Sequence, residues 1–283
     1  MRRPVLMCLT ASLLVGCAAK KNAVRPAYYG PTDPLPTLVD KLNERNGRLQ
    51  SLRAEGRFSA DLIDPVTKDR TSPPDGDVTL LYMPPRNLRL AAKVFTERAF
   101  DIGSNSDRYW LILPRQETMY WGTHGSDTGQ AARLPIRPDL LVEVLGITPL
   151  ETDLLQSPAP VLRFNNDQDC YMLTWQVRLP DRFAVQKEVW YDRQTLQPRL
   201  VLLFDVNGRV VLRAYPSDVK KVHGYDPPVE MPSRYELMFP DMQSTFSLRL
   251  SDLERERNGV PAARSFVFPE RPAGVSKVEP LDR

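Results

Sequence analysis

The chain has 283 residues, 42% hydrophobic and 26% charged, an ordinary composition for a globular protein with a buried core. The formal net charge of +3 is too balanced to indicate binding of nucleic acid or of a strongly acidic substrate. The 27 prolines favour many short strands and turns over long helices. All-β folds often reach this length as a single domain, which is the organisation we expect for the body.

The first 16 residues are typical of a cleaved export signal. Arg2 and Arg3 form a basic start, and the apolar stretch Val5–Val15 is shorter than the about 20 apolar residues that span a bilayer. This stretch runs into Leu14-Val15-Gly16-Cys17, which resembles the bacterial lipobox. In proteins with that signature the cysteine sulfur receives a diacylglycerol, the signal is cut before the cysteine, and the new amine is acylated. The resemblance implies a signal peptide at residues 1–16 and a lipid anchor, including palmitate, on Cys17.

The residues after this cysteine indicate where the anchor places the protein. Two or three acyl chains give stable membrane attachment, whereas a single chain is marginal. Ala18 stands where an inner-membrane retention signal usually has aspartate, so the resemblance implies an outer-membrane lipoprotein of the cell envelope that faces the periplasm. Residues 17–34 are rich in small residues, proline and charge, and we expect them to form a lipidated flexible tether.

The body begins with a predicted helix over Pro36–Asn46, because apolar residues recur at helical spacing from Leu35 to Leu42. Alternation of charged with small or apolar residues then predicts a long strand from Arg53 to Leu62. Turn signals separate five further predicted strands: Asp77–Met83, Asn87–Val94, Ala99–Gly103, Arg108–Leu113 and Thr118–Trp121. This pattern predicts a meander of antiparallel hairpins.

A second short helix is predicted over Arg137–Gly146, with proline near its start and glycine at its end. Seven more strands are predicted: Val161–Phe164, Cys170–Arg178, Ala184–Tyr191, Arg199–Val206, Val210–Tyr215, Ser233–Phe239 and Thr245–Leu250. Asn207-Gly208 is a strong hairpin signal between two of them. The C-terminal residues 271–283 are rich in proline and charge, and we expect an irregular tail.

Two stretches of the body carry a distinctive order of strands and turns. In the first, Glu188–Asp192 leads to Leu196-Gln197-Pro198 and then to Phe204–Val210, with an aspartate turn and a glycine turn between strands. In the second, Pro85–Leu90 is followed by Phe100–Ser104 and by Tyr109-Trp110-Leu111. This layout resembles the LolA/LolB-like family, the lipoprotein-sorting fold, over about residues 35–270. The resemblance implies a mainly β fold with α (α+β), a strongly curved antiparallel half-barrel with helices on its concave side.

By this resemblance the concave face holds an apolar cavity that shelters an acyl chain or the lipid of a lipoprotein. Exposure of such a chain to water costs about 25 cal/mol per Å². A large apolar void under the helix predicted at 137–146 would favour lipid handling, and a packed interior would favour docking. The residues that we expect to line the cavity are Phe58, Leu62, Leu90, Phe100, Ile102, Leu111, Leu141, Leu145, Trp175 and Trp190.

The sequence carries no strong catalytic or metal signal. His124 and His223 lie beside glycine in predicted loops, without partners at zinc spacing. Asp127-Thr128-Gly129 matches the aspartic-protease tripeptide but follows no apolar strand, and Asn165–Asp169 lacks the glycine and distal glutamate of a calcium loop. Phosphate-loop, nucleophile-elbow and dinucleotide motifs are absent. We therefore expect no enzymatic activity, no metal and no cofactor. Cys170 is the only cysteine of the predicted body, which excludes an intrachain disulfide there.

Two functions stay open at this point. The first is a membrane-anchored lipoprotein that binds a hydrophobic ligand in a half-barrel cavity and acts in lipoprotein or lipid trafficking. The alternative is a non-enzymatic structural or docking lipoprotein of a cell-envelope complex, with a filled core and an envelope protein as its partner. Both attach to the membrane through the N-terminal lipid, and neither binds nucleic acid.

Overall fold

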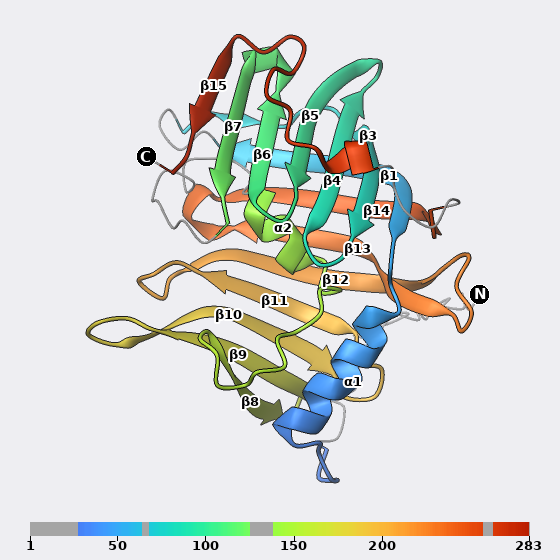
Figure 1. The fold of residues 1–283 in the computed structure, drawn as a ribbon, viewed down its shortest axis with the longest axis vertical. Helices are drawn as coiled ribbons and strands as arrows, with labels where there is room; N and C mark the ends of the chain where they lie inside the picture. Colours follow the sequence, from blue (N-terminus) through green and yellow to red (C-terminus); the bar gives the residue numbers. More distant parts are fainter. Residues whose placement is uncertain (1–27, 64–67, 125–137, 257–262, 283) are drawn as a thin grey trace, which may run out of the picture.

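The computed structural model describes residues 28–63, 68–124, 138–256 and 263–282. Figure 1 shows its elements, and the bounds of the helices are α1 (Leu35–Gly47), α2 (Pro138–Val144) and the short 3-10 helices η1 (Pro114–Gln116), η3 (Pro240–Met242) and η4 (Ala263–Phe266). The lipobox cysteine and the Asp-Thr-Gly tripeptide at 127–129 lie outside the described residues.

The strands are β1 (Leu52–Ile63), β2 (Arg70–Thr71), β3 (Gly76–Met83), β4 (Asn87–Val94), β5 (Glu97–Ser104), β6 (Arg108–Leu113), β7 (Thr118–Thr123), β8 (Ala159–Asn165), β9 (Cys170–Arg178), β10 (Phe183–Asp192), β11 (Pro198–Phe204), β12 (Val210–Val222), β13 (Val229–Phe239), β14 (Ser244–Glu254) and β15 (Lys277–Pro280). Every strand predicted from the sequence is present. The structure adds the short strands β2 and β15, and it extends β12 and β13 beyond their predicted ends.

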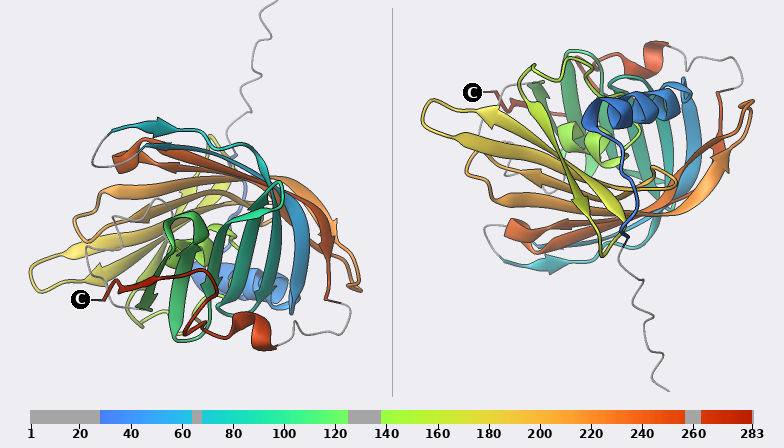
Figure 2. Two further views of the ribbon diagram at one scale, coloured as in Figure 1. Left: turned by 90° about the horizontal axis from the view of Figure 1, so that it is seen from above. Right: turned by 90° about the horizontal axis from the view of Figure 1, so that it is seen from below.

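These strands form one large, open and curved sheet of 15 strands (Figure 2). The order across the sheet is β15-β7-β6-β5-β4-β3-β1-β14-β13-β12-β11-β10-β9-β8, with β2 paired to the end of β1. All neighbours are antiparallel except β15, which runs parallel to β7. Because β1 pairs with β14 at the centre, the N-terminal meander and the C-terminal meander join into a single sheet whose two edges stay apart.

Helix α1 forms where the apolar period predicts it, and Leu38, Val39 and Leu42 are its buried hydrophobic residues. Side-chain amides tie the helix to the segment that follows α2. Asn43 exchanges two hydrogen bonds with the backbone of Leu150, and Asn46 donates to the carbonyl of Thr148 at 2.9 Å. These bonds fix the position of α1 against the loop that leads from α2 into the second meander.

The C-terminal segment covers the face of β6 and β7 that points away from the main core. Phe268 packs edge-on against Trp110 and Trp121, with ring centroids 5.7 and 5.6 Å apart. Strand β15 then pairs with the free edge of β7, so the prediction of irregular structure for 271–283 is wrong at Lys277–Pro280. An open sheet edge presents unpaired backbone groups, and these groups order a passing segment that has little strand character of its own.

Candidate functional site

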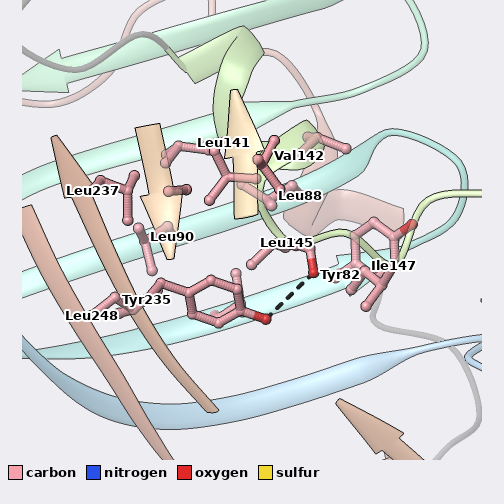
Figure 3. Close-up of a cluster of buried hydrophobic side chains, with 14 of the residues drawn as sticks. Tyr82, Leu88, Leu90, Leu141, Val142, Leu145, Ile147, Tyr235, Leu237 and Leu248 are labelled. Atoms are coloured by element: carbon pink, nitrogen blue, oxygen red, sulfur yellow. Dashed lines mark hydrogen bonds between the residues drawn. The ribbon is translucent and has the colours of Figure 1, made fainter. Parts of the chain in front are cut away.

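Two hollows of very different size border α2. The smaller, about 20 Å³, has room for about one water molecule. It lies where α2 packs against strands of both meanders, and its lining consists of Leu80, Leu88, Leu90, Leu141, Val144, Leu145, Tyr235, Leu237, Phe246 and Leu248. Tyr235 crosses this region, and its hydroxyl lies 3.5 Å from the carbonyl of Leu145 (Figure 3). The interior on this side of α2 is therefore packed.

The larger hollow, about 600 Å³, lies on another side of α2 and has a volume typical of ligand pockets. Its walls come from α2, from strands β9 to β12, and from the ends of the first meander. The residues that line it are Arg86, Tyr109, Thr123, His124, Leu140, Val142, Glu143, Pro158, Trp175, Val177, Leu179, Ala184, Gln186, Lys187, Leu203, Phe204, Asp205, Val206 and Val211. Most of these side chains are apolar, and the charged ones form a minority.

Alternation along the strands explains why β9 and β10 supply this wall. Trp175 and Val177 lie two residues apart on β9, and Val177 is the register partner of Ala184 on β10. A bulge between Val185 and Lys187 then shifts the alternation on β10. Lys187 consequently lies on the same face of β10 as the buried Val189, and its side chain lines the cavity.

Lys187 and Glu143 form the ion pair of this cavity. The Nζ atom of Lys187 lies 2.6 Å from Oε2 of Glu143 and 4.3 Å from the ring centroid of Trp175. The positive charge of Lys187 holds the pKa of Glu143 below its ordinary value, against the opposing effect of burial, and the charge of Arg86 adds to this lowering. The carboxylate therefore stays ionised, and its ion pair joins α2 to β10 in the wall of the cavity.

His124 and Ser104 form a histidine–serine contact of the kind that occurs in hydrolases. Ser104 Oγ lies 3.2 Å from His124 Nε2, and the carbonyl oxygen of Asn105 lies 3.0 Å from the same nitrogen. A carbonyl only accepts hydrogen bonds, so the Asn105 contact favours the tautomer with a proton on Nε2, in which this nitrogen cannot take a proton from Ser104. In that tautomer the pair is not an activated nucleophile.

No cluster of three metal-ligating side chains occurs among the residues that the structure describes. Cys170 is buried, and burial raises the pKa of its thiol. In the same part of the chain, no helix is long and apolar enough to cross a bilayer.

The ten residues predicted as cavity lining fall into separate groups. Leu90, Leu141 and Leu145 line the small hollow, and Trp175 lines the large one. Phe58 and Phe100 pack against each other and against Phe246 with centroid distances of 5.1 to 6.1 Å. Ile102 and Leu111 face each other as register partners inside the core. Leu62 and Trp190 are half-buried and line neither hollow, and the indole of Trp190 donates to Glu188.

Sequence reasoning missed most of the larger cavity. The apolar residues Val142, Val177, Ala184 and Leu203 read as ordinary strand and helix positions. The one available signal was Lys187, a charged residue two positions before Val189 and four before Tyr191, both of which are buried. A lysine in an otherwise apolar register indicates a polar spot within a buried face.

Comparison with solved structures identifies the type of fold. No sequence-family model matches the chain, and no curated protein matches it in sequence. Solved structures do match, and they show that the chain has a LolA-like fold. One is a LolA superfamily protein from Nitrosomonas europaea, 14% identical, with a TM-score of 0.50 over 82% of this chain and 96% of that one. Another is a DUF1329 family protein from Desulfovibrio piger, also 14% identical, with a TM-score of 0.52 over 83% of this chain and all of that one.

Proposed function

We propose that this chain is a membrane-anchored lipoprotein that binds a hydrophobic ligand, an acyl chain or the lipid of a lipoprotein, and acts in lipid or lipoprotein trafficking. The observation that carries the proposal is the 600 Å³ hollow walled mainly by apolar side chains. Each buried CH₂ group contributes about 0.8 kcal/mol, so a ten-carbon segment gains about 8 kcal/mol before entropic costs. In this arrangement α1 and α2 cover the concave side of the sheet, and α2 forms one wall of the binding cavity.

The anchor is the second part of the proposal. Cys17 carries the lipid after removal of residues 1–16, residues 17–34 act as the tether, and residues 35–270 form the binding domain. The motif Leu14-Val15-Gly16-Cys17 supports the anchor, and Ala18 supports a place in the outer membrane facing the periplasm. The proposed role is non-enzymatic.

Two valines of equal exposure test ligand binding. Val206 lines the large cavity and is 46% exposed, whereas Val219 lies outside it and is 45% exposed. The full chain is purified from cell envelopes in a non-ionic detergent, and bound lipid is quantified by extraction and mass spectrometry. Val206→Asp should lower the copurified lipid severalfold, because it sets a charge against the acyl chain, and Val219→Asp should leave it unchanged. Wild-type chain without copurified lipid, and without uptake of a fluorescent fatty acid, would overturn the proposal.

A second candidate is the docking lipoprotein of an envelope complex. The packed interior between α2 and strands β3, β4, β13 and β14 favours it, because only about 20 Å³ stays open there. The test is crosslinking of the full chain in intact cells. One stoichiometric envelope protein recovered equally by wild type and by Val206→Asp would favour docking over lipid handling.

A further inference from the structure

The large cavity has a charged side as well as an apolar one. Arg86 enters it from the turn between β3 and β4, Glu143 from α2, and Lys187 from β10. Glu143 and Lys187 bond to each other, and the charges of Arg86 and Lys187 both act on the Glu143 carboxylate. Three elements distant in sequence therefore bring charged side chains into the lining of this hollow, beside the apolar strand residues.

The charged groups of this lining are not all paired with one another. Lys187 is neutralised by Glu143 at 2.6 Å. Asp205, the other acidic lining residue, is occupied by Arg209, whose Nη2 lies 2.9 Å from its Oδ2. Arg86, by contrast, forms no hydrogen bond or ion pair with any residue that the structure describes. Within the described ranges, one guanidinium group of the lining therefore acts on Glu143 only through its charge, without a direct bond.

We propose that the cavity binds an amphiphile with a single anionic headgroup, a carboxylate or a phosphate, whose head pairs with Arg86 while its tail lies against Trp175 and the β9–β11 wall. This inference rests on the proposed function and narrows its ligand. A guanidinium pairs with carboxylate or phosphate through two parallel N–H donors, which a neutral headgroup cannot match. The tail lies along the apolar residues of β9 to β11. The ammonium group of Lys187, which sits over the Trp175 ring, lies next to this apolar surface.

The charge of the headgroup distinguishes two ligands that both fit the proposed function. A fully acylated lipoprotein N-terminus has no ionised headgroup, since its amine is an amide and its sulfur a thioether. Such a ligand would leave Arg86 without a partner. A fatty acid or a phosphate-bearing lipid would satisfy it, and the affinity of either would fall as salt screens the exposed guanidinium.

The test compares brominated C16 chains that end in a carboxylate, a phosphate or an alcohol. Bromine quenches tryptophan fluorescence on contact, and Trp175 lines the cavity. The full chain in non-ionic detergent is titrated with each probe, and the ratio of alcohol to acid dissociation constants is compared between variants, so partition into micelles cancels. Trp175→Phe shows which part of the quenching comes from the cavity.

Wild type should bind the carboxylate or the phosphate probe about tenfold tighter than the alcohol, and Arg86→Gln should abolish this preference without changing alcohol affinity. The carboxylate and phosphate probes rank the two anion sources. Arg249→Gln is the matched control, because Arg249 is exposed, lines neither hollow and forms no ion pair within the described part of the chain. Equal affinity for acid and alcohol in wild type would overturn the headgroup assignment and leave the proposed function standing. Absence of Trp175 quenching by every probe would overturn both.

Discussion

Replacement of Ala184 by phenylalanine tests whether the large hollow is truly empty of protein atoms. Ala184 lies on β10, is 7% exposed and lines the cavity. A phenyl ring added there should fit within the hollow of about 600 Å³ and reach the wall formed by Trp175 and Val177. Ala92 on β4 is the matched position, since it is fully buried in the main core and lines neither hollow.

Only the substitution at Ala92 should lower the free energy of unfolding. Burial of a phenylalanine side chain contributes about 1.5–3 kcal/mol, and the loss of its rotamer freedom takes back about 1 kcal/mol. Ala184→Phe should therefore leave stability unchanged or raise it by up to about 2 kcal/mol. Ala92→Phe forces extra volume into packed surroundings and should cost about 1–3 kcal/mol or more.

The assay is urea unfolding of the full chain in a non-ionic detergent, followed by tryptophan fluorescence, with copurified lipid measured on the same preparations. Ala184→Phe should lose bound lipid while it keeps its stability, a combination that general misfolding does not produce. Destabilisation by Ala184→Phe as large as that by Ala92→Phe would refute the reasoning, because the space around Ala184 would then already be filled.

Three other predictions concern stability. Asp101 is fully buried and forms a two-point ion pair with the partly exposed Arg89, so Asp101→Asn should lower the free energy of unfolding by about 2–3 kcal/mol. Glu97→Gln, which breaks an exposed ion pair, should lower it by less than about 1 kcal/mol. Equal losses in urea unfolding would contradict this. The lowered pKa of Glu143 means that its pairing stabilises the fold above the ordinary glutamate range and is lost as pH falls through the folded pKa. The stability gap between wild type and Glu143→Gln should therefore be large near pH 7 and shrink as pH falls below the ordinary glutamate range; a gap independent of pH would be inconsistent with the ion pair. Gly56→Ala should lower the free energy of unfolding by at least about 2 kcal/mol, because a Cβ there would clash with the carbonyl oxygen of Arg249. At Gly47 a Cβ meets no atom within 4 Å, so Gly47→Ala should raise the free energy of unfolding by up to about 1 kcal/mol; thermal unfolding measures both.

The strands were predictable because each repeats a local rule that the chain obeys. Alternation set the faces of β1 and β3, and the Asp205–Gly208 turn closes the β11–β12 hairpin as the Asn-Gly signal indicates. Helix α1 followed from its apolar stripe. These features depend on neighbours within a few residues, and so a single sequence carries them.

The large cavity could not be found in that way, because it depends on distances between elements. Whether Leu141 or Val142 faces a hollow is decided by how α2 sits between two meanders, and the sequence predicted Leu141, which lies in the packed side. The bulge at Val185/Lys187 also reverses the face of Lys187 without any glycine to mark it. Strand β15 forms through the free edge of β7 rather than through its own residues.

Photocrosslinking tests the central claim of a lipid in this cavity most directly. The full chain, solubilised from envelopes, is irradiated with a fatty acid that carries a diazirine near its methyl end, and the modified peptides are identified by mass spectrometry. A fatty acid bound in the cavity should leave adducts on β9 to β11, at or next to Trp175, Val177 and Leu203. Ala184→Phe should abolish these adducts. Adducts spread over the exposed surface, unaffected by Ala184→Phe, would contradict it.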